Sequence, residues 1–201
     1  MKQYSESCDE NKAVILDILR DEFPDCRHIL EIGSGTGQHA VYFAGAMPHL
    51  VWQTSDRKCN HASIDAWRTE SGLDNILPPL SLDVTLDHWP DTAYDGVFSA
   101  NTTHIMAWPD VKHMFGGIGR VLSDGGVFCL YGPFNYAGKF TSASNERFDH
   151  WLRERDPASG LRNFEDLDEL ARANGMRLKR DHEMPVNNRL LVWTRTGGLA
   201  R

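Results

Sequence analysis

Three glycines at alternate positions follow an apolar run that carries an acid near its end. The run covers residues 29–32 and contains Glu31, and the glycines are Gly33, Gly35 and Gly37. A pattern of apolar residues at helical spacing begins directly after them. Glycine lets the backbone come close to a ligand, and a helix N-terminus directs amide N–H groups and partial positive charge at it. The segment therefore predicts a strand, a tight turn and a helix arranged around a bound molecule.

The spacing of the glycines and the position of Glu31 indicate the kind of ligand. Dinucleotide-binding turns follow G-x-G-x-x-G, whereas this turn reads G-x-G-x-G, with Ser34 after its first glycine. A carboxylate two residues before the first glycine disfavours a pyrophosphate and suits a ligand that carries a positive charge. S-adenosylmethionine combines a carboxylate, an ammonium group and a sulfonium. We therefore expect this cofactor, and the spacing disfavours a nicotinamide-dependent oxidoreductase.

Two more acids each close a β-like run. Asp56 ends the run 51–56, about 20 residues after the glycines, where an acid accepts hydrogen bonds from ribose hydroxyls. Asp83, followed by Val84, ends the run 80–83 and is a candidate for the adenine amino group. Taken singly, Asp56 is also compatible with a helix N-cap or a turn, and Asp83 with an ordinary turn. Their order along the chain favours the ligand-binding interpretation.

Apolar periodicity predicts strands that alternate with helices along most of the chain. This alternation implies a doubly wound parallel sheet with helices on both faces. The last two strands, 176–183 and 189–194, follow one another across a short turn and predict an antiparallel hairpin. The fold class we expect is a Rossmann-like α/β fold with a mostly parallel seven-stranded sheet that ends in this hairpin. The other expected strands span residues 28–32, 50–54, 76–82, 94–100 and 127–131, and the expected helices span 9–22, 37–46, 60–70, 109–122, 145–155 and 164–174.

Length and composition disfavour several classes of protein, including membrane, metal-binding and nucleic-acid-binding proteins. We expect one domain over residues 1–201, with a flexible tail at 195–201. No apolar run approaches the ~20 residues of a membrane span, and the acidic N-terminal segment does not resemble a secretory signal. Four scattered cysteines without a C-x-x-C pair disfavour a metal site and suit a reducing cytoplasm. The net charge of −7 and the lack of a Lys/Arg stripe disfavour nucleic acid, so we expect a small-molecule substrate; the oligomeric state is not predicted.

The loops after the fourth and fifth strands contain the candidates for catalysis. In a doubly wound sheet the ligand lies outside the carboxyl ends of the strands, so Asn101 and His104 should meet Tyr131 there. Asn101 is either a contact of the cofactor's methionine part or a turn residue. His104 is the best candidate for a general base, and its alternative role is to cap the next helix. Tyr131 either binds substrate or simply ends its strand.

Aromatic and amide side chains near these loops are candidates for a substrate pocket. An aromatic wall would suit a small aromatic or cationic substrate, although aromatic residues at such spacings also occur in cores. The histidines of the predicted helices, His39 and His113, are expected to be surface or packing residues. The pocket candidates are Trp108, Phe134, Asn135 and Tyr136.

Beyond these local arguments, the chain resembles the class I S-adenosylmethionine-dependent methyltransferases. Within them it is similar to the methyltransferase-like 26 proteins, also called the domain-of-unknown-function 938 family. The resemblance covers nearly the whole chain and implies cofactor contacts from Asn11, from the glycine turn, and from Asp56 and Asp83 at the ribose and adenine positions. The segments that carry it are EIGSGTG (31–37), Asn11-Lys12, WQTSD (52–56), NTTHIMAW (101–108), YGPF (131–134), FTSASNERFD (140–149) and RDPASGLR (155–162).

Two hypotheses about function follow. The first is an enzyme that transfers a methyl group from S-adenosylmethionine to a small molecule and releases S-adenosylhomocysteine. The second is a protein with the same fold that binds the cofactor without transfer and acts in regulation or interaction. The second stays open because Asp9-Glu10 stands where the family would have an Arg. A second departure from the family pattern is Thr102-Thr103, where relatives are more apolar.

Overall fold

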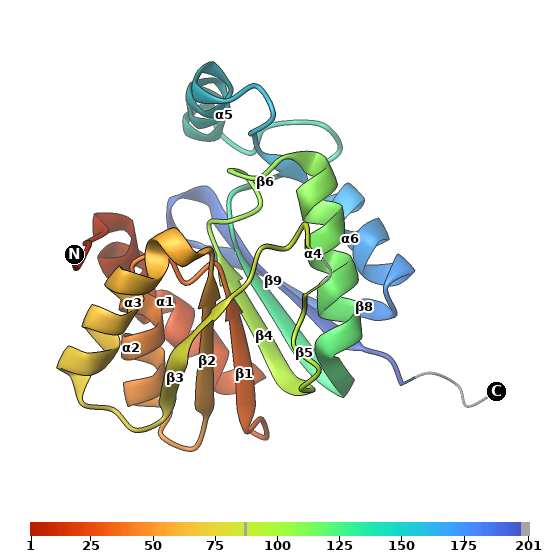
Figure 1. Cartoon of the computed structure of the whole chain (residues 1–201). Helices are drawn as coiled ribbons and strands as arrows, with labels where there is room; N and C mark the ends of the chain where they lie inside the picture. Colours follow the sequence, from red (N-terminus) through yellow and green to blue (C-terminus); the bar gives the residue numbers. More distant parts are fainter. Residues whose placement is uncertain (87, 198–201) are drawn as a thin grey trace.

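The computed structural model describes residues 1–86 and 88–197 and contains a central seven-stranded sheet (Figure 1). The strand order is β3-β2-β1-β4-β5-β9-β8. The first five strands pair in parallel, whereas β9 pairs antiparallel with both β5 and β8. The predicted Rossmann-like fold class with its C-terminal hairpin is therefore confirmed. The strands are β1 (His28–Ile32), β2 (Val51–Asp56), β3 (Ile76–Ser81), β4 (Tyr94–Ala100), β5 (Leu122–Gly132), β8 (Met176–Met184) and β9 (Asn188–Arg195).

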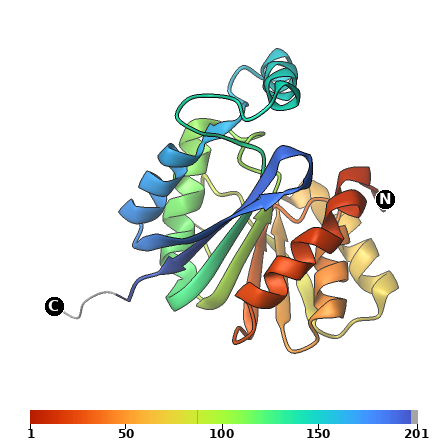
Figure 2. The ribbon, with the colours of Figure 1, turned by 180° about the vertical axis from the view of Figure 1, so that it is seen from behind.

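Helices cover both faces of the sheet, as Figures 1 and 2 show. Helices α1 (Glu6–Glu22) and α2 (Gln38–Ala46) pack on one face, with α3 (Lys58–Ser71) beside α2. Helices α4 (Trp108–Val121) and α6 (Phe164–Ala173) pack on the other face. Helix α5 (Ala143–Arg155) projects beyond the carboxyl ends of the parallel strands. None of the helices in the described part of the chain is long and apolar enough to cross a membrane.

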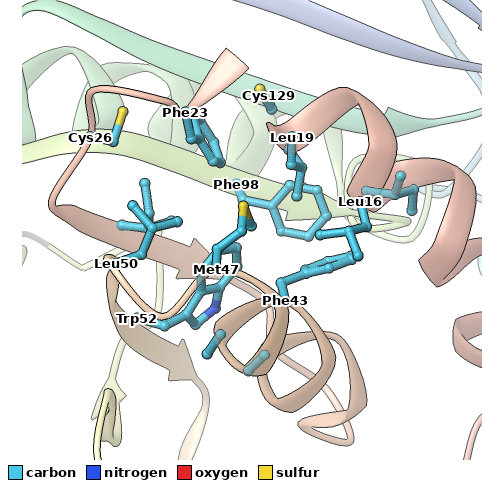
Figure 3. Close-up of a cluster of buried hydrophobic side chains, with 14 of the residues drawn as sticks. Leu16, Leu19, Phe23, Cys26, Phe43, Met47, Leu50, Trp52, Phe98 and Cys129 are labelled. Carbon is cyan, nitrogen blue, oxygen red and sulfur yellow. The ribbon is translucent and has the colours of Figure 1, made fainter. Parts of the chain in front are cut away.

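Two apolar cores fix the sheet against its helices. On the α1 and α2 face, Phe43 meets Phe98 edge-on at 5.3 Å between ring centroids and Trp52 at 5.7 Å (Figure 3). Cys26 and Cys129 are buried in the same core. Aromatic pairs of this geometry contribute about 0.5–1.5 kcal/mol beyond their buried area. The packing therefore fixes α2 against β2 and β4.

The register brings the ends of the parallel strands to one edge of the sheet. Ile32 pairs with Ser55, Asp56 with Ser81, and Ala100 with Tyr131. The loops that follow β1, β2, β3, β4 and β5 consequently open on the same side. This edge is where the sequence predicts the ligand.

Several boundaries differ from the sequence prediction. Helix α1 begins at Glu6 rather than residue 9, because the Ser5 hydroxyl caps it by accepting the Cys8 N–H. Strand β5 already begins at Leu122 rather than at residue 127, and its pairing with β4 shifts register between Tyr94 and Gly96. A second sheet joins β6 (Phe134–Asn135) to β7 (Arg162–Asn163), which the sequence did not predict, and a short 3-10 helix, η1, spans Pro185–Asn187. Of the expected flexible tail, residues 198–201 lie outside the described part of the chain.

Candidate functional site

A cavity of about 530 Å³ opens at the carboxyl ends of the strands. Its walls come from the loops after β1, β2, β3 and β4, and from the segment that begins α1. The volume lies within the range of small-molecule sites. The cavity therefore coincides with the edge at which the sequence predicts ligand binding.

The glycine turn after β1 forms one wall of this cavity. Gly33 and Gly35 line it, and both have positive φ, at 73° and 56°. A Cβ on Gly33 would lie 2.5 Å from Cγ2 of Thr102, so a side chain there would clash with the loop after β4. The N–H groups of Gly33 and Ser34 donate to the Ser55 carbonyl at 3.1 and 3.0 Å. The turn is therefore held in shape by its neighbouring strand.

Gly37 lies away from the cavity wall, against α3. Its φ is 94°, and a Cβ there would lie 2.9 Å from Cα of Ile64. A side chain at this position would force α2 and α3 apart. The structure thus places Gly37 at a helix contact, and its predicted role in cofactor binding has no support from the geometry of the wall.

Asp56 lies at the cavity wall and ties β2 to the glycine turn. Its Oδ2 accepts the Gly35 N–H at 2.7 Å. Its Oδ1 accepts the N–H of Arg57 at 2.7 Å and the Asn60 side-chain amide at 2.9 Å. A carboxylate has about four lone-pair sites, so Oδ2 retains one for a ligand.

Asp83 and Val84 form a further part of the wall, next to the end of β3. Oδ1 of Asp83 accepts the Thr85 hydroxyl at 2.7 Å and the Thr85 N–H at 3.0 Å. These bonds lower the pKa of Asp83, so the group is an ionised acceptor at neutral pH. Its Oδ2 is available to a ligand.

Glu31 lies beneath the glycine turn and outside the cavity wall. It is buried and accepts the Ser34 hydroxyl at 2.8 Å and the Trp52 indole N–H at 3.1 Å. Burial raises the pKa of Glu31 to about 7, and the nearby Asp56 carboxylate acts in the same direction. The position of Glu31 shows how it supports Ser34 from below; a direct contact to a cofactor stays a prediction.

Asn101 and His104 converge at the end of β5. Asn101 lines the cavity in a left-handed conformation with φ 57°, and its N–H donates to the Tyr131 carbonyl at 2.9 Å. Asn101 Oδ1 and His104 Nδ1 would each lie 3.8 Å from a Cβ on Gly132. Phe134 Cζ lies at 3.7 Å from the same point, so Gly132 brings the two polar atoms and an aromatic ring close together at the end of β5.

His104 itself is buried near Gly132 and is not among the residues that line the cavity. Its ring meets Phe148 edge-on at 5.3 Å. Burial, aided by the positive charge of Arg162, lowers the pKa of His104 to about 4. Within the described part of the chain, neither ring nitrogen has a hydrogen-bond partner. The imidazole is therefore neutral at physiological pH.

Tyr131 and Asn11, both predicted site residues, belong to one buried polar group. Side-chain hydrogen bonds from Asn188 and Asn11 lower the pKa of Tyr131, but burial has the larger effect and raises it. Oδ1 of Asn11 faces His39 Nε2 at 2.7 Å. His39, expected at the surface or in packing, is buried and lines the cavity.

The four predicted pocket residues lie away from the cavity. Phe134 is in the core behind α4, and Trp108 lies under the guanidinium of Arg162. The Tyr136 hydroxyl donates to Asp181 at 2.8 Å. Asn135 Oδ1 is buried and finds no partner among the described residues. A substrate pocket built from these residues stays a prediction.

The sequence interpretation also missed the N-terminal wall. Ser5, Ser7 and Cys8 line the cavity. Gln38 holds this segment: its Oε1 accepts the Ser5 N–H at 2.6 Å, and its Nε2 donates to the Ser5 carbonyl at 3.2 Å. The sequence does contain a signal for His39 as a cavity residue, because it lies in the first helical turn after the glycines.

Comparison with known proteins identifies a family and a fold. The family model described as "Protein of unknown function (DUF938)" matches residues 2–195. An O-methyltransferase family protein from Burkholderia thailandensis is similar in structure, with a TM-score of 0.83 at 14% identity over 93% of this chain and 57% of its own. Human N-acetylserotonin methyltransferase, solved in complex with S-adenosylmethionine, has a TM-score of 0.79 at 14% identity over 96% of this chain and 53% of its own.

A third similar structure is an O-methyltransferase family 2 protein from Planctomyces limnophilus in complex with apigenin. Its TM-score is 0.75 at 13% identity over 85% of this chain and 51% of its own. The chain thus spans about half the length of the solved structures it matches. At these identities the likeness shows the fold, which is that of class I methyltransferase-like proteins.

Proposed function

Because the chain belongs to the DUF938 family and has a class I methyltransferase-like fold, we propose that it transfers a methyl group from S-adenosylmethionine to a small molecule. One observation carries the proposal. Gly33 and Gly35, Asp56 and Asp83 follow three successive strands in the sequence and line one cavity. A nucleoside with a charged amino-acid part matches this set of groups.

The donor groups of the wall suit this cofactor. The free site on Oδ2 of Asp56 would accept a ribose hydroxyl, and Asp83 would accept the adenine amino group, with Val84 beside the ring. The charged side chains of the wall are Asp56, Asp83, Asp110, Asp156 and Arg57. An excess of carboxylates favours a cation such as a sulfonium and disfavours an anionic polymer. When bound, the cofactor supplies a methyl group that is already activated for displacement.

The proposed position of the methyl acceptor is the side of the cavity formed by Asn101. Asn101 Oδ1 and His104 Nδ1 both lie near Gly132, and both can accept a hydrogen bond from an O–H or N–H group. His104 is neutral, because burial lowers its pKa to about 4, so its lone pair can take the proton of the nucleophile as the methyl group is transferred. Most of the rate gain would come from alignment, which is worth about 7–11 kcal/mol at best. Tyr131 would assist by hydrogen bonding.

A binding protein without transfer is the second candidate. It is favoured by the position of Trp108, Phe134 and Tyr136, which pack or pair within the protein instead of lining the cavity. Such a protein would bind the cofactor as tightly as the enzyme would, but it would form no S-adenosylhomocysteine. The four cysteines are free, and in either case we propose a reducing, cytoplasmic location.

Thermal unfolding with added ligands tests the cofactor. A ligand that binds the native state raises stability by mass action, so S-adenosylmethionine and S-adenosylhomocysteine should each raise the melting temperature, and NAD should not. A shift with NAD alone would refute the assignment. Incubation of the protein with methyl-labelled cofactor and a metabolite extract then separates the enzyme from the binding protein, because only the enzyme labels a small molecule.

A further inference from the structure

His39 occupies the cavity wall in a defined orientation. It lies in the first turn of α2, 6% exposed, with its ring stacked on Phe43 at 5.2 Å between centroids. The edge of the same ring meets Phe98 at 6.1 Å. These two contacts fix the plane of the imidazole, so its two nitrogens point in set directions.

The partner of Nε2 determines which nitrogen of His39 carries the proton. Oδ1 of Asn11 lies 2.7 Å from Nε2 and can only accept. Nε2 must therefore donate, and Nδ1 carries a lone pair. In the described part of the chain, Nδ1 has no hydrogen-bond partner, and His39 is one of the residues that line the cavity.

The amino-acid part of the cofactor requires such an acceptor. Its ammonium group has three N–H donors. Glu31, the acid predicted to suit the positively charged end of the ligand, is directed at Ser34 and Trp52 beneath the turn. Asp56 and Asp83 lie at the ends of β2 and β3, where the nucleoside would bind. His39 is a neutral acceptor that lines the same cavity as Ser7 and Cys8.

We propose that His39 is a cofactor-binding residue whose Nδ1 accepts a hydrogen bond from the ammonium group of the bound cofactor, with Asn11 as the positioning residue that fixes its tautomer. This inference rests on the proposed function, because it assigns one part of the cofactor to one side of the cavity. Burial supports it, since it lowers the pKa of His39 to about 4 and keeps the ring neutral beside a cation.

Calorimetric titration of three probes tests the assignment. S-adenosylhomocysteine carries the ammonium group, its deaminated analogue keeps only the carboxylate, and 5′-methylthioadenosine lacks the amino-acid part. His39→Phe preserves the stacking on Phe43 but removes both nitrogens. We expect it to lower the affinity for S-adenosylhomocysteine by roughly 10- to 100-fold, which is the size of one hydrogen bond to a charged group. The affinities for the other two probes should change by less than about 2-fold, because the substitution removes none of their contacts.

Two further variants serve as a partial rescue and as a matched control. His39→Gln retains a donor for Asn11 and an acceptor for the cavity, so it should recover part of the lost affinity. His113→Phe makes the same exchange at an exposed position of α4 and should change nothing. An equal loss for all three probes in His39→Phe would show a structural role and overturn the inference, as would unchanged binding. If the unmodified protein binds none of the probes, the proposed function itself fails.

Discussion

Replacing Glu31 by Gln should remove a pH dependence from the stability of the protein. The folded carboxyl has a pKa of about 7 against an ordinary value of 4.5, a difference of about 2.5 units. Each unit corresponds to 1.36 kcal/mol, so Glu31 contributes about 3 kcal/mol of pH-dependent stability. Because the folded pKa is raised, that contribution is complete below pH 4.5 and is lost as the pH rises through 7. Above that value the folded protein must hold a buried carboxylate beside Asp56.

The measurement is the free energy of unfolding in urea at several pH values for both proteins. Glutamine can accept from Ser34 and Trp52 as Glu31 does, so the variant should fold. Between pH 5 and 8 the parent protein should lose about 2–3 kcal/mol relative to Glu31→Gln. His39 and His104, with lowered pKa values, destabilise both proteins as the pH falls below 6.5 and cancel in the comparison. A constant difference across this range would refute the reasoning.

Two predictions concern the site. Asp56→Ala should weaken the binding of S-adenosylmethionine by roughly 1–3 kcal/mol, because a charged acceptor for the ribose is lost. Calorimetry compares this variant with Asp65→Ala, since Asp65 pairs with Arg68 on α3. Equal affinity in both variants would remove Asp56 from the site. His104→Ala should lower the rate of labelled methyl transfer by about 10²–10⁴-fold with little change in cofactor affinity. A rate equal to that of the exposed-site variant His113→Ala would leave His104 a structural role.

The fold followed from the sequence because its signals are local and repeated. Gly33, Gly35 and Gly37 predicted a tight turn, and all three have the positive φ that glycine permits. Alternating apolar runs placed seven strands in the sheet, and the Pro/Asn turn between β8 and β9 produced the antiparallel hairpin. The second sheet was missed because β6 and β7 have two residues each and lie far apart in the sequence. A strand of two residues is too short to show the alternation of apolar and polar residues from which strands are predicted.

The site followed from the sequence only in part, because a side chain's direction depends on tertiary contacts. Asp56 and Asp83 line the cavity as their places at strand ends suggested. Glu31 turns away because its neighbours Ser34 and Trp52 offer two donors in the interior. His39 turns inward because Phe43 and Asn11 hold its ring. The spacing of residues along the chain predicts neither side-chain orientation.

The acids near the ends of β1 and β2 also hold the glycine turn in a defined shape. Glu31 holds Ser34 from below, and Asp56 holds Gly35 from the side. These bonds fix the direction of the amide groups of the turn. An ordered binding loop loses little conformational entropy on association, so under the proposed function the turn would bind the cofactor at a small entropic cost. Glu31 would then act on the cofactor through the backbone that it positions.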